Sequence, residues 1–464
     1  MNPITIQQVR QVVGGEPCSP LPADAPRIES VCTDTRSMKP ASLFIALRGE
    51  RFDAHAFLPA AAAGGAVAAL VERVPADVPA GLHLIKVPDT RAAMGALARF
   101  VRLRLGGTVI GVAGSNGKTS TKYLIHAALK PALRGTFSPG SYNNDVGVPL
   151  AIFPADPGQD YLVLEIGTNH PGEIRNLALM ALPDIAVITN CAAEHLEFFG
   201  DIDGVRREEA SIIEGLNPTG TLVVNGDDPA LLDAVQEYAG KRVTFGAAPT
   251  NDLFATDIVE DRRGVRFRLN GDGEVTVPLL GRHTAINALA AIAVARCMDV
   301  PQESILAGLA RARGPDMRMQ LVQVNGITII NDAYNANPPS MKSALETLCM
   351  LQTAGRRIAV LGDMRELGRT SEAYHRALGQ LAGGCPLDAL VCVGREAAWT
   401  AEEAAKTLGP KRVRHYAQAA QAAHAVAGAL RSGDLVLVKG SRAMRLEEIV
   451  QAIQRQQAPA VAAG

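Results

Sequence analysis

Short apolar runs alternate with stretches of helical periodicity along the central and C-terminal parts of the chain. In the central part the apolar runs cover residues 108–113, 161–164, 185–189 and 221–224. In the C-terminal part they cover residues 327–330, 358–361, 389–393 and 435–438. Strands that alternate with helices in this way predict parallel sheets with helices on both faces.

Two other parts of the chain show different patterns. In the N-terminal part we predict a helix over 7–13, strands over 43–47 and 66–71, and a helix over 91–105 that stops at Gly106-Gly107. Polar and apolar residues alternate within 252–277, which predicts antiparallel hairpins. The pattern resets near residue 314, so we expect an α/β fold with domains over 1–88, 89–313 and 314–464.

Composition agrees with a folded chain of this size. The 464 residues suffice for three domains, with 47% hydrophobic and 20% charged residues. Lysine and arginine (46) balance aspartate and glutamate (47), which leaves a formal net charge of -1. Such a chain lacks the basic surface through which proteins bind nucleic acids or anionic membranes, so we expect neither as a partner.

Cysteine usage and the N-terminus indicate the cytoplasm. The seven cysteines include no C-x-x-C pair and several lie in apolar runs, so we expect buried, reduced thiols. The first residues, Met1 to Thr5, lack the basic-then-apolar layout of a signal peptide, and the apolar stretch 60–71 is too short to span a bilayer. We expect a cytoplasmic protein and a monomer.

The strongest chemical signal is a glycine-rich segment between a predicted strand and a predicted helix over 122–129. The segment is Gly111-Val112-Ala113-Gly114-Ser115-Asn116-Gly117-Lys118-Thr119-Ser120-Thr121. Glycines let backbone N–H groups turn toward one anion, and a helix N-terminus adds partial positive charge. Lys118 is placed to reach the outer phosphates of a nucleotide, and Thr119 to ligate Mg²⁺. The strict phosphate-loop pattern has glycine at Val112, so a chance glycine-rich turn is the alternative.

Two candidate residues follow predicted strands. Glu165 ends the run 161–165 at the carboxyl edge of the sheet, where open α/β sheets bind ligands, and a nucleotide site needs a carboxylate for Mg²⁺. His195 follows the strand 185–189 and is flanked by Glu194. Each has a plain alternative, a helix cap for Glu165 and a structural role for His195.

Further segments resemble the Mur ligases, ATP-dependent enzymes that form amide bonds in peptidoglycan precursors. The first domain carries Asp34-Thr35-Arg36 and 47–55, the second carries 114–119, 142–149, 167–174 and 281–289, and the third carries 332–338, 362–368 and 438–442. The run Tyr334-Asn335-Ala336-Asn337-Pro338 is most similar to that of the members that add D-alanyl-D-alanine. Members that add other amino acids carry a different peptide there.

The resemblance implies an enzyme with a small α/β N-terminal domain for a UDP-sugar, a central P-loop ATPase domain, and a C-terminal doubly wound, Rossmann-like domain. The implied reaction uses ATP and Mg²⁺ to phosphorylate the terminal carboxylate of UDP-N-acetylmuramoyl-tripeptide, and D-alanyl-D-alanine then attacks the acyl phosphate. Phosphorylation is chemically sensible because a free carboxylate is a poor acyl donor. The third residue of the tripeptide, diaminopimelate or lysine, stays open.

The resemblance also implies roles for individual residues. Lys118, Glu165 and His195 are the implied catalytic residues. ATP binding is implied for Gly114, Ser115, Asn116, Gly117, Lys118, Thr119, Ser120, Asn287, Arg318 and Asp332. Substrate binding is implied for Thr35, Arg36, Asn143, Asn144, Asn335 and Asn337, and metal binding for Thr119, Glu165, His195 and Glu209. Asn335 and Asn337 are also ordinary turn formers before Pro338. For His375 we consider a position on the surface of a helix.

Two positions depart from the family pattern. Met317 stands where a glycine usually precedes the arginine, so we expect the local turn to differ. Many members carry a lysine, carbamylated by CO₂, in the helix after the His195 motif, and the alignment places Glu209 there. A glutamate would offer Mg²⁺ carboxylate oxygens in place of the carbamate. The alternative is a solvated helix charge within the run 206–209.

Two other functions share the phosphate loop. Folylpolyglutamate synthase has the loop and the chemistry, but its substrate motifs do not match the N-terminal segment of this chain. A P-loop switch or transport ATPase would use ATP to change shape, and it would leave the run 334–338 and the first domain unexplained. ATP hydrolysis without an acceptor would favour the switch, and dependence on D-alanyl-D-alanine would favour the ligase.

Overall fold

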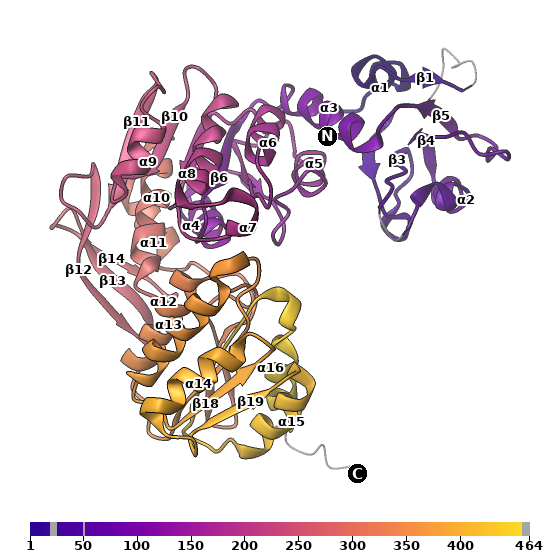
Figure 1. Ribbon diagram of the computed structural model, residues 1–464. Helices are drawn as coiled ribbons and strands as arrows, with labels where there is room; N and C mark the ends of the chain where they lie inside the picture. Colours follow the sequence, from indigo (N-terminus) through magenta and orange to yellow (C-terminus); the bar gives the residue numbers. More distant parts are fainter. Residues whose placement is uncertain (19–25, 50–51, 457–464) are drawn as a thin grey trace, which may run out of the picture.

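Three β-sheets follow one another along the chain in the computed structural model, which describes residues 1–18, 26–49 and 52–456. The predicted α/β fold with three successive parts is confirmed (Figure 1). Glu50 and Arg51 of the segment 47–55 lie outside the described residues. The domain boundaries at 88/89 and 313/314 stay predictions.

The first sheet has five strands in the order β1-β5-β4-β3-β2, and only β1 runs antiparallel to its neighbour. Its elements are α1 (Ile6–Val13), β1 (Glu16–Pro17), β2 (Ser30–Cys32), β3 (Ser42–Ile45), α2 (Leu58–Ala63), β4 (Ala66–Val71) and β5 (His83–Lys86). The predicted helix over 7–13 and strand over 66–71 are confirmed, whereas the strand predicted over 43–47 ends at Ile45.

Helix α3 (Thr90–Arg102) joins the first sheet to the second. Its apolar face is buried, and it packs against α1 and against α6 (Glu173–Ala181). It ends before the predicted stop at Gly106-Gly107. The Arg102 guanidinium donates to the Ala181 carbonyl at 2.9 Å and pairs with Asp184 at 2.7 Å, which anchors this end of the helix on the second domain.

The second sheet has nine strands in the order β14-β13-β12-β11-β10-β9-β6-β8-β7. Its strands are β6 (Thr108–Ala113), β7 (Gly135–Phe137), β8 (Tyr161–Glu165), β9 (Ile185–Ile188), β10 (Thr221–Asn225), β11 (Lys241–Gly246), β12 (Leu253–Asp261), β13 (Gly264–Leu269) and β14 (Glu274–Val277). Strands β6 to β12 are parallel, and β12 to β14 form the predicted antiparallel hairpins.

Helices cover both faces of the second sheet. They are α4 (Lys118–Leu129), α5 (Gly147–Ile152), α6, α7 (Leu196–Phe199), α8 (Ile202–Ala210), α9 (Pro229–Ala234), α10 (His283–Cys297) and α11 (Gln302–Leu309). Alternate residues of one strand face opposite layers: Val109 packs with α3, α5 and α6, and Ile110 packs with α4, α10 and α11. This double burial explains the continuous apolar runs of the parallel strands.

The third sheet has six strands in the order β15-β16-β20-β17-β18-β19. Its elements are β15 (Gln320–Val324), β16 (Ile327–Asp332), α12 (Pro338–Met350), β17 (Arg357–Gly362), α13 (Ser371–Gly383), β18 (Ala389–Val393), α14 (Ala397–Leu408), β19 (Val413–Tyr416), α15 (Ala419–Ala429), β20 (Leu435–Lys439) and α16 (Glu447–Gln456). Helices α12 to α14 pack on one face and α15 and α16 on the other, so the doubly wound prediction is confirmed.

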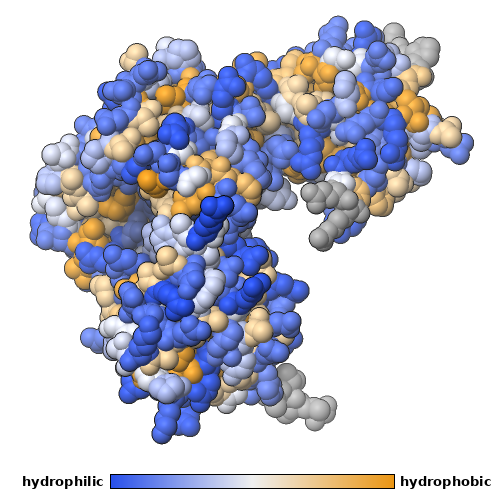
Figure 2. Space-filling view, in the orientation of Figure 1, coloured by the Kyte–Doolittle hydropathy of each residue, from blue (hydrophilic) through white to orange (hydrophobic). Residues whose placement is uncertain are grey.

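The second and third domains pack together, whereas the first projects away from both (Figures 1 and 2). The first domain reaches the second through α3, and the third domain packs through α12 against strand β12. None of the helices in the described part of the chain is long and apolar enough to cross a membrane.

Candidate active site

A cavity of about 780 Å³ lies between the second and third domains. Of the sequence-predicted residues, its lining includes Ser115, Asn116, Gly117, Lys118, Ser120, Asn143, Asn144, Glu165, His195, Asn287, Arg318, Asp332, Asn335 and Asn337. Gly114, Thr119, Glu209, Thr35 and Arg36 are outside this lining. The cavity lies where strands of both sheets end, as expected for ligand sites of open α/β folds.

The glycine-rich segment connects β6 directly to α4. Helix α4 begins at Lys118, earlier than the predicted start at Lys122. Gly117 adopts φ +82°, and a Cβ atom there would lie 2.7 Å from the Asn287 Oδ1 atom. Glycine is therefore required at this position by its backbone conformation and by the close approach of Asn287.

The backbone N–H groups at the start of the loop donate hydrogen bonds to other groups of the protein. Gly114 donates to Glu209 Oε2 at 2.6 Å, Ser115 to the Asn190 carbonyl at 2.8 Å, and Asn116 to Asn190 Oδ1 at 3.1 Å. Among the described residues, no side chain caps the N-terminus of α4. The N–H groups of its first turn therefore face the cavity with the partial positive charge of the helix, which suits an anion such as phosphate.

Lys118 lies over this loop with acidic side chains around it. Its Nζ atom donates to the Ser115 carbonyl at 3.2 Å and lies 3.9 Å from Glu194 Oε1. Burial by itself would lower the pKa of Lys118, but Glu194, Glu209 and Glu165 outweigh burial and raise that pKa. Lys118 is thus a cation held at the loop.

Glu165 is buried at the end of β8 and both of its carboxylate oxygens have partners. Oε2 lies 2.9 Å from Lys122 Nζ, and Oε1 accepts from Asn143 Nδ2 at 3.0 Å. Lys122 is fully buried, and burial lowers its pKa. Lys122 also donates to the Gly140 carbonyl, so it joins Glu165 to the loop that precedes Asn143.

His195 contacts the third domain. Its Nδ1 atom pairs with Glu366 Oε2, and both residues have positive φ angles, 48° and 64°. A carboxylate at one ring nitrogen of a histidine fixes its tautomer and leaves the other nitrogen for a ligand. Glu366 belongs to the segment 362–368. In the sequence this segment resembles the family, but no role is predicted for Glu366.

Glu209 lies behind the phosphate loop rather than on the helix surface. It is fully buried, so the alternative of a solvated helix charge is wrong. Burial raises the pKa of Glu209 to about 8, against the opposing effect of Lys118. Its Oε1 atom has no hydrogen-bond partner in the described part of the chain.

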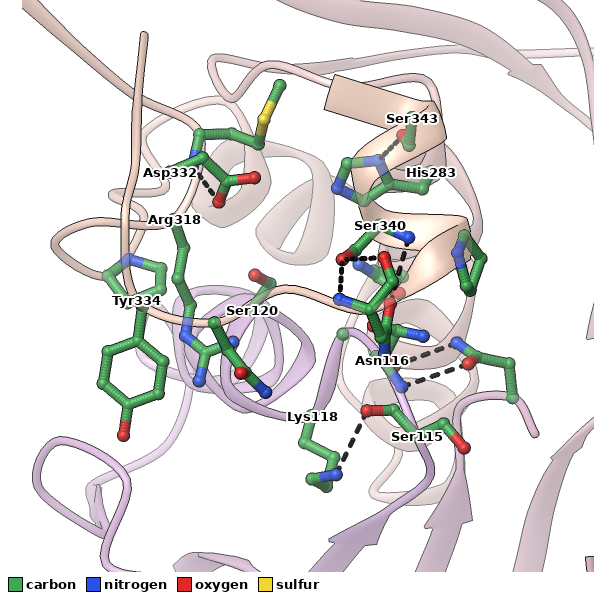
Figure 3. A pocket seen from close by; sticks show the side chains of 18 of the residues that line it. Ser115, Asn116, Lys118, Ser120, His283, Arg318, Asp332, Tyr334, Ser340 and Ser343 are labelled. Carbon is green, nitrogen blue, oxygen red and sulfur yellow. Dashed lines mark hydrogen bonds between the residues drawn. The ribbon is translucent and has the colours of Figure 1, made fainter. Parts of the chain in front are cut away.

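The third domain presents Arg318 and Asp332 to the cavity (Figure 3). Asp332 Oδ2 pairs with Lys439 Nζ at 2.6 Å, and Asp332 Oδ1 accepts from the Met319 N–H at 3.1 Å. The Arg318 guanidinium carbon lies 4.1 Å from the centre of the Tyr334 ring. Met317, where the resemblance leads us to expect glycine, adopts φ +56°, the left-handed conformation that glycine adopts without steric cost.

Asn337 connects the third domain to the phosphate loop. Its side chain caps α12 by accepting from the Ser340 N–H at 3.0 Å, so the turn-former alternative holds for its local role. Its Nδ2 atom also donates to Asn116 Oδ1 at 2.9 Å. Asn335 is exposed and lines the same cavity.

Thr35 and Arg36 lie in the first domain, apart from this cavity. Arg36 is exposed and pairs with Asp34 at 2.6 Å. A second cavity of about 460 Å³ lies between the first domain and α3 and is lined by Arg48, Gly49, Glu72, Pro88, Asp89 and Arg91. The structure therefore does not bring the predicted UDP-sugar residues to the phosphate loop.

Two further expectations need correction. His375 is fully buried rather than on a helix surface, and its Nε2 atom accepts from the Met364 N–H at 3.0 Å. All seven cysteines are free thiols, but only Cys392 is buried, whereas Cys18 is exposed and the others are half-buried. Apolar neighbours in sequence did not place these thiols in the core.

Buried oxygen atoms near the loop fit a magnesium ion. Thr119 Oγ1 and Glu194 Oε1 are buried without a hydrogen-bond partner in the described residues, and Mg²⁺ prefers such oxygen ligands. The described residues contain no group of three or more His, Cys, Asp or Glu arranged for a metal. Few protein ligands suffice, however, because Mg²⁺ in nucleotide sites is held largely by phosphates and water.

Sequence reasoning missed Lys122, Glu194 and Tyr334 as parts of the site. Lys122 follows Lys118 by one helical turn, and this spacing is a signal that it lies on the same side of α4. Glu194 directly precedes His195. For Tyr334, only its place beside Asn335 pointed to the cavity.

Strand β6, the uncapped N-terminus of α4 and Lys118 in the first turn of that helix define a phosphate-binding site of the P-loop class. Family models match three segments: "Mur ligase family, catalytic domain" over 27–102, "Mur ligase middle domain" over 112–295, and "Mur ligase, glutamate ligase domain" over 317–442. The chain belongs to the Mur ligase family.

Individual relatives match over nearly the whole length. The chain is 37% identical to the UDP-N-acetylmuramoyl-tripeptide--D-alanyl-D-alanine ligase of Bacillus subtilis, covering 96% of this chain and 97% of that one. It is similar to a crystal structure of MurF from Acinetobacter baumannii, with a TM-score of 0.87, 32% identity and coverage of 98% and 99%. MurF ligase from Thermotoga maritima in complex with ADP matches with a TM-score of 0.81, 28% identity and coverage of 92% and 98%.

Proposed function

We propose that the chain is an ATP-dependent ligase that joins D-alanyl-D-alanine to UDP-N-acetylmuramoyl-tripeptide, in the last cytoplasmic step of peptidoglycan precursor peptide assembly. The hydrogen bond between Asn116 of the phosphate loop and Asn337 of the run 334–338 carries the proposal. Because both segments line one cavity, an activated carboxylate and an acceptor amine can meet there. The similarity to the named ligases and to the ADP complex supports it.

The proposed chemistry begins with transfer of the ATP γ-phosphoryl group to the tripeptide carboxylate. The dipeptide amine then attacks the acyl carbon, and inorganic phosphate leaves. Lys118 and the N-terminus of α4 stabilise charge on the transferred phosphoryl group, and Arg318 does so from the third domain. When bound, Mg²⁺ supplies further neutralisation of phosphate charge.

Other roles follow from the same proposal. Thr119 would hold Mg²⁺ through its hydroxyl, with Glu194 as a carboxylate whose oxygen has no partner among the described residues. To bind a metal, Glu165 would release Lys122 or share its carboxylate with it. His195 would likewise release Glu366 or bind the metal through its other ring nitrogen. The further proposed contacts are Asn287 with adenine, Asp332 with ribose, Thr35 and Arg36 with the UDP-sugar, and Asn143, Asn144, Asn335 and Asn337 with the joined peptides. The cytoplasmic location and the monomeric state stay predictions.

An ADP-release assay over a panel of UDP-sugar peptides and dipeptides tests this function. We expect release only when UDP-N-acetylmuramoyl-tripeptide and D-alanyl-D-alanine are both present, and the panel should include tripeptides ending in diaminopimelate and in lysine. Mass spectrometry should detect the joined product. ATP hydrolysis without an acceptor would instead support a switch ATPase.

A further inference from the structure

Arg318 brings a positive charge into the cavity that no carboxylate of the described residues neutralises by an ion pair. Three lysines at this site have acidic partners: Lys118 with Glu194 at 3.9 Å, Lys122 with Glu165 at 2.9 Å and Lys439 with Asp332 at 2.6 Å. Arg262 also lines the cavity, and its guanidinium donates to the Gln352 carbonyl at 2.6 Å. For Arg318 the side-chain hydrogen bond is to the Ser141 hydroxyl at 3.5 Å, the outer limit of such contacts.

An aromatic ring takes the place of an acid beside this guanidinium. The Arg318 Cζ atom lies 4.1 Å from the centre of the Tyr334 ring, within the range of cation–π contacts. Figure 3 shows the Arg318 side chain beside this ring and directed toward the side where Ser120 lies. A ring attracts and orients a guanidinium without cancelling its net charge, whereas a carboxylate would neutralise it.

The backbone around Arg318 is tied to the same segment. Both neighbours of Arg318 adopt left-handed conformations, Met317 with φ +56° and Met319 with φ +51°. Such conformations cost energy for residues with side chains and persist only where other contacts hold them. Here the Tyr334 N–H donates to the Met317 carbonyl at 3.2 Å, and the Met319 N–H donates to Asp332 Oδ1 at 3.1 Å.

We infer that Tyr334 is a positioning residue that holds Arg318 toward the terminal phosphate of the nucleotide while leaving its charge available. The inference rests on the proposed function for the identity of the anion. Tyr334 adjoins Asn335, which is proposed to contact the joined peptides. The inference assigns Tyr334 a different role, which is to position Arg318. The run that distinguishes the acceptor thus also supports the phosphate-contacting arginine.

Nucleotide binding by the full-length protein in magnesium buffer tests the inference without any acceptor. Isothermal titration should compare a non-hydrolysable ATP analogue with ADP, because only the analogue carries the terminal phosphate. We expect Tyr334→Leu to weaken the analogue about three- to tenfold and ADP by less than twofold. Tyr334→Phe keeps the ring and should restore the affinity for the analogue.

A double-mutant cycle separates positioning from direct contact. In an Arg318→Ala background, Tyr334→Leu should have no further effect on the affinity for the analogue, because the residue through which it acts is gone. Three results would each overturn the inference. They are an equal loss of affinity for the analogue and for ADP in Tyr334→Leu, additive losses of affinity for the analogue in the double variant, and a defect of Tyr334→Leu that is confined to the KM for D-alanyl-D-alanine. The assay over a panel of acceptors tests the proposed function separately. Failure of the proposed function can therefore be distinguished from failure of the inference about Tyr334.

Discussion

Asn337 caps helix α12 of the third domain and, with the same side chain, donates a hydrogen bond to Asn116 of the phosphate loop at 2.9 Å. The two asparagines lie 221 positions apart in the sequence. The start of α12 is therefore positioned against the phosphate loop, and the residues just before it enter the cavity.

We expect Asn337→Ala to lower stability and to raise the KM for ATP. Loss of an N-cap costs about 1 kcal/mol, and the contact with the loop is lost as well. Ser340→Ala is the matched control, because it removes the reciprocal bond from the Asn337 N–H to Ser340 Oγ and leaves Asn116 untouched. Calorimetry should show destabilisation in both variants and steady-state kinetics a raised KM in Asn337→Ala alone. Equal KM changes in both variants would count against a role for the contact with the loop.

We expect Lys118→Ala to abolish turnover in a folded protein. A group that stabilises developing charge in a transition state contributes about 3–4 kcal/mol or more, a loss of about 150-fold or more in kcat. Lys130→Ala, an exposed position directly after α4, is the control and should keep its activity. ADP release and circular dichroism measure the two properties. Normal turnover by Lys118→Ala would remove the basis of the phosphate-loop assignment.

Lys122→Met should strongly destabilise the protein. It leaves the fully buried Glu165 without its cationic partner, and an unpaired buried charge costs about 3–5 kcal/mol. The double variant Lys122→Met/Glu165→Leu should recover much of this loss, because it removes both charges. Urea unfolding of the three proteins measures the effect. Additive losses in the double variant would show that the two side chains do not act as a pair.

In the third sheet, the strands buried on both faces could be predicted from the sequence, and the two edge strands could not. Strand β18 is continuously apolar because helices cover both of its faces. The edge strands β15 and β19 mix polar and apolar residues, since each pairs with a strand on one side only within the described part of the chain. Short, mixed segments of this kind resemble loops in a single sequence.

The candidate site divides in the same way between local and distant features. The phosphate loop is contiguous in sequence and needs only a strand before it and a helix after it, so its pattern was recognisable. Glu366 lies 171 positions from His195, and no local pattern indicates that pair. Pairings of this kind depend on how the third domain packs on the second.

Acid should destabilise the protein partly through His126. Its ring contacts Tyr161 Oη at 2.9 Å, and burial lowers its pKa from 6.5 to about 4. Between these values the unfolded chain binds a proton that the folded protein does not, so this contribution is complete above pH 6.5 and is lost as the pH falls toward 4.

Thermal unfolding from pH 7 to pH 4.5 measures this contribution. His126→Gln retains hydrogen-bonding capacity without titrating, so its melting temperature should fall less over this range than that of the unchanged protein. His424→Gln, at an exposed position, should behave like the unchanged protein. Identical pH dependence of all three proteins would exclude His126 as the source.

The last prediction concerns Glu209, which the family resemblance suggests as the replacement for a carbamylated lysine. Its Oε2 atom accepts from the Gly114 N–H at 2.6 Å, and its Oε1 atom lacks a partner in the described residues. Two roles are open for Glu209: to ionise and ligate Mg²⁺ as a carboxylate, or only to hold the loop as an acceptor for Gly114. Glu209→Gln separates these roles, because glutamine keeps a side-chain oxygen for Gly114 but cannot ionise to a carboxylate.

We expect the activity of the unchanged protein to be independent of bicarbonate. At low magnesium, kcat should fall about tenfold or more in both Glu209→Gln and Glu209→Ala. Excess magnesium should restore part of the activity, since weaker metal binding is the expected defect. Activity retained by Glu209→Gln but lost in Glu209→Ala would limit the residue to holding the loop. Glu208→Ala is the neighbouring control: Glu208 accepts from the N–H groups of Gly172 and Ile174 at 2.7 and 2.9 Å, so its loss should lower stability without a magnesium-dependent kcat. The reverse result, a magnesium-dependent defect in Glu208→Ala beside normal kinetics in Glu209→Ala, would identify Glu208 as the residue that replaces the carbamate.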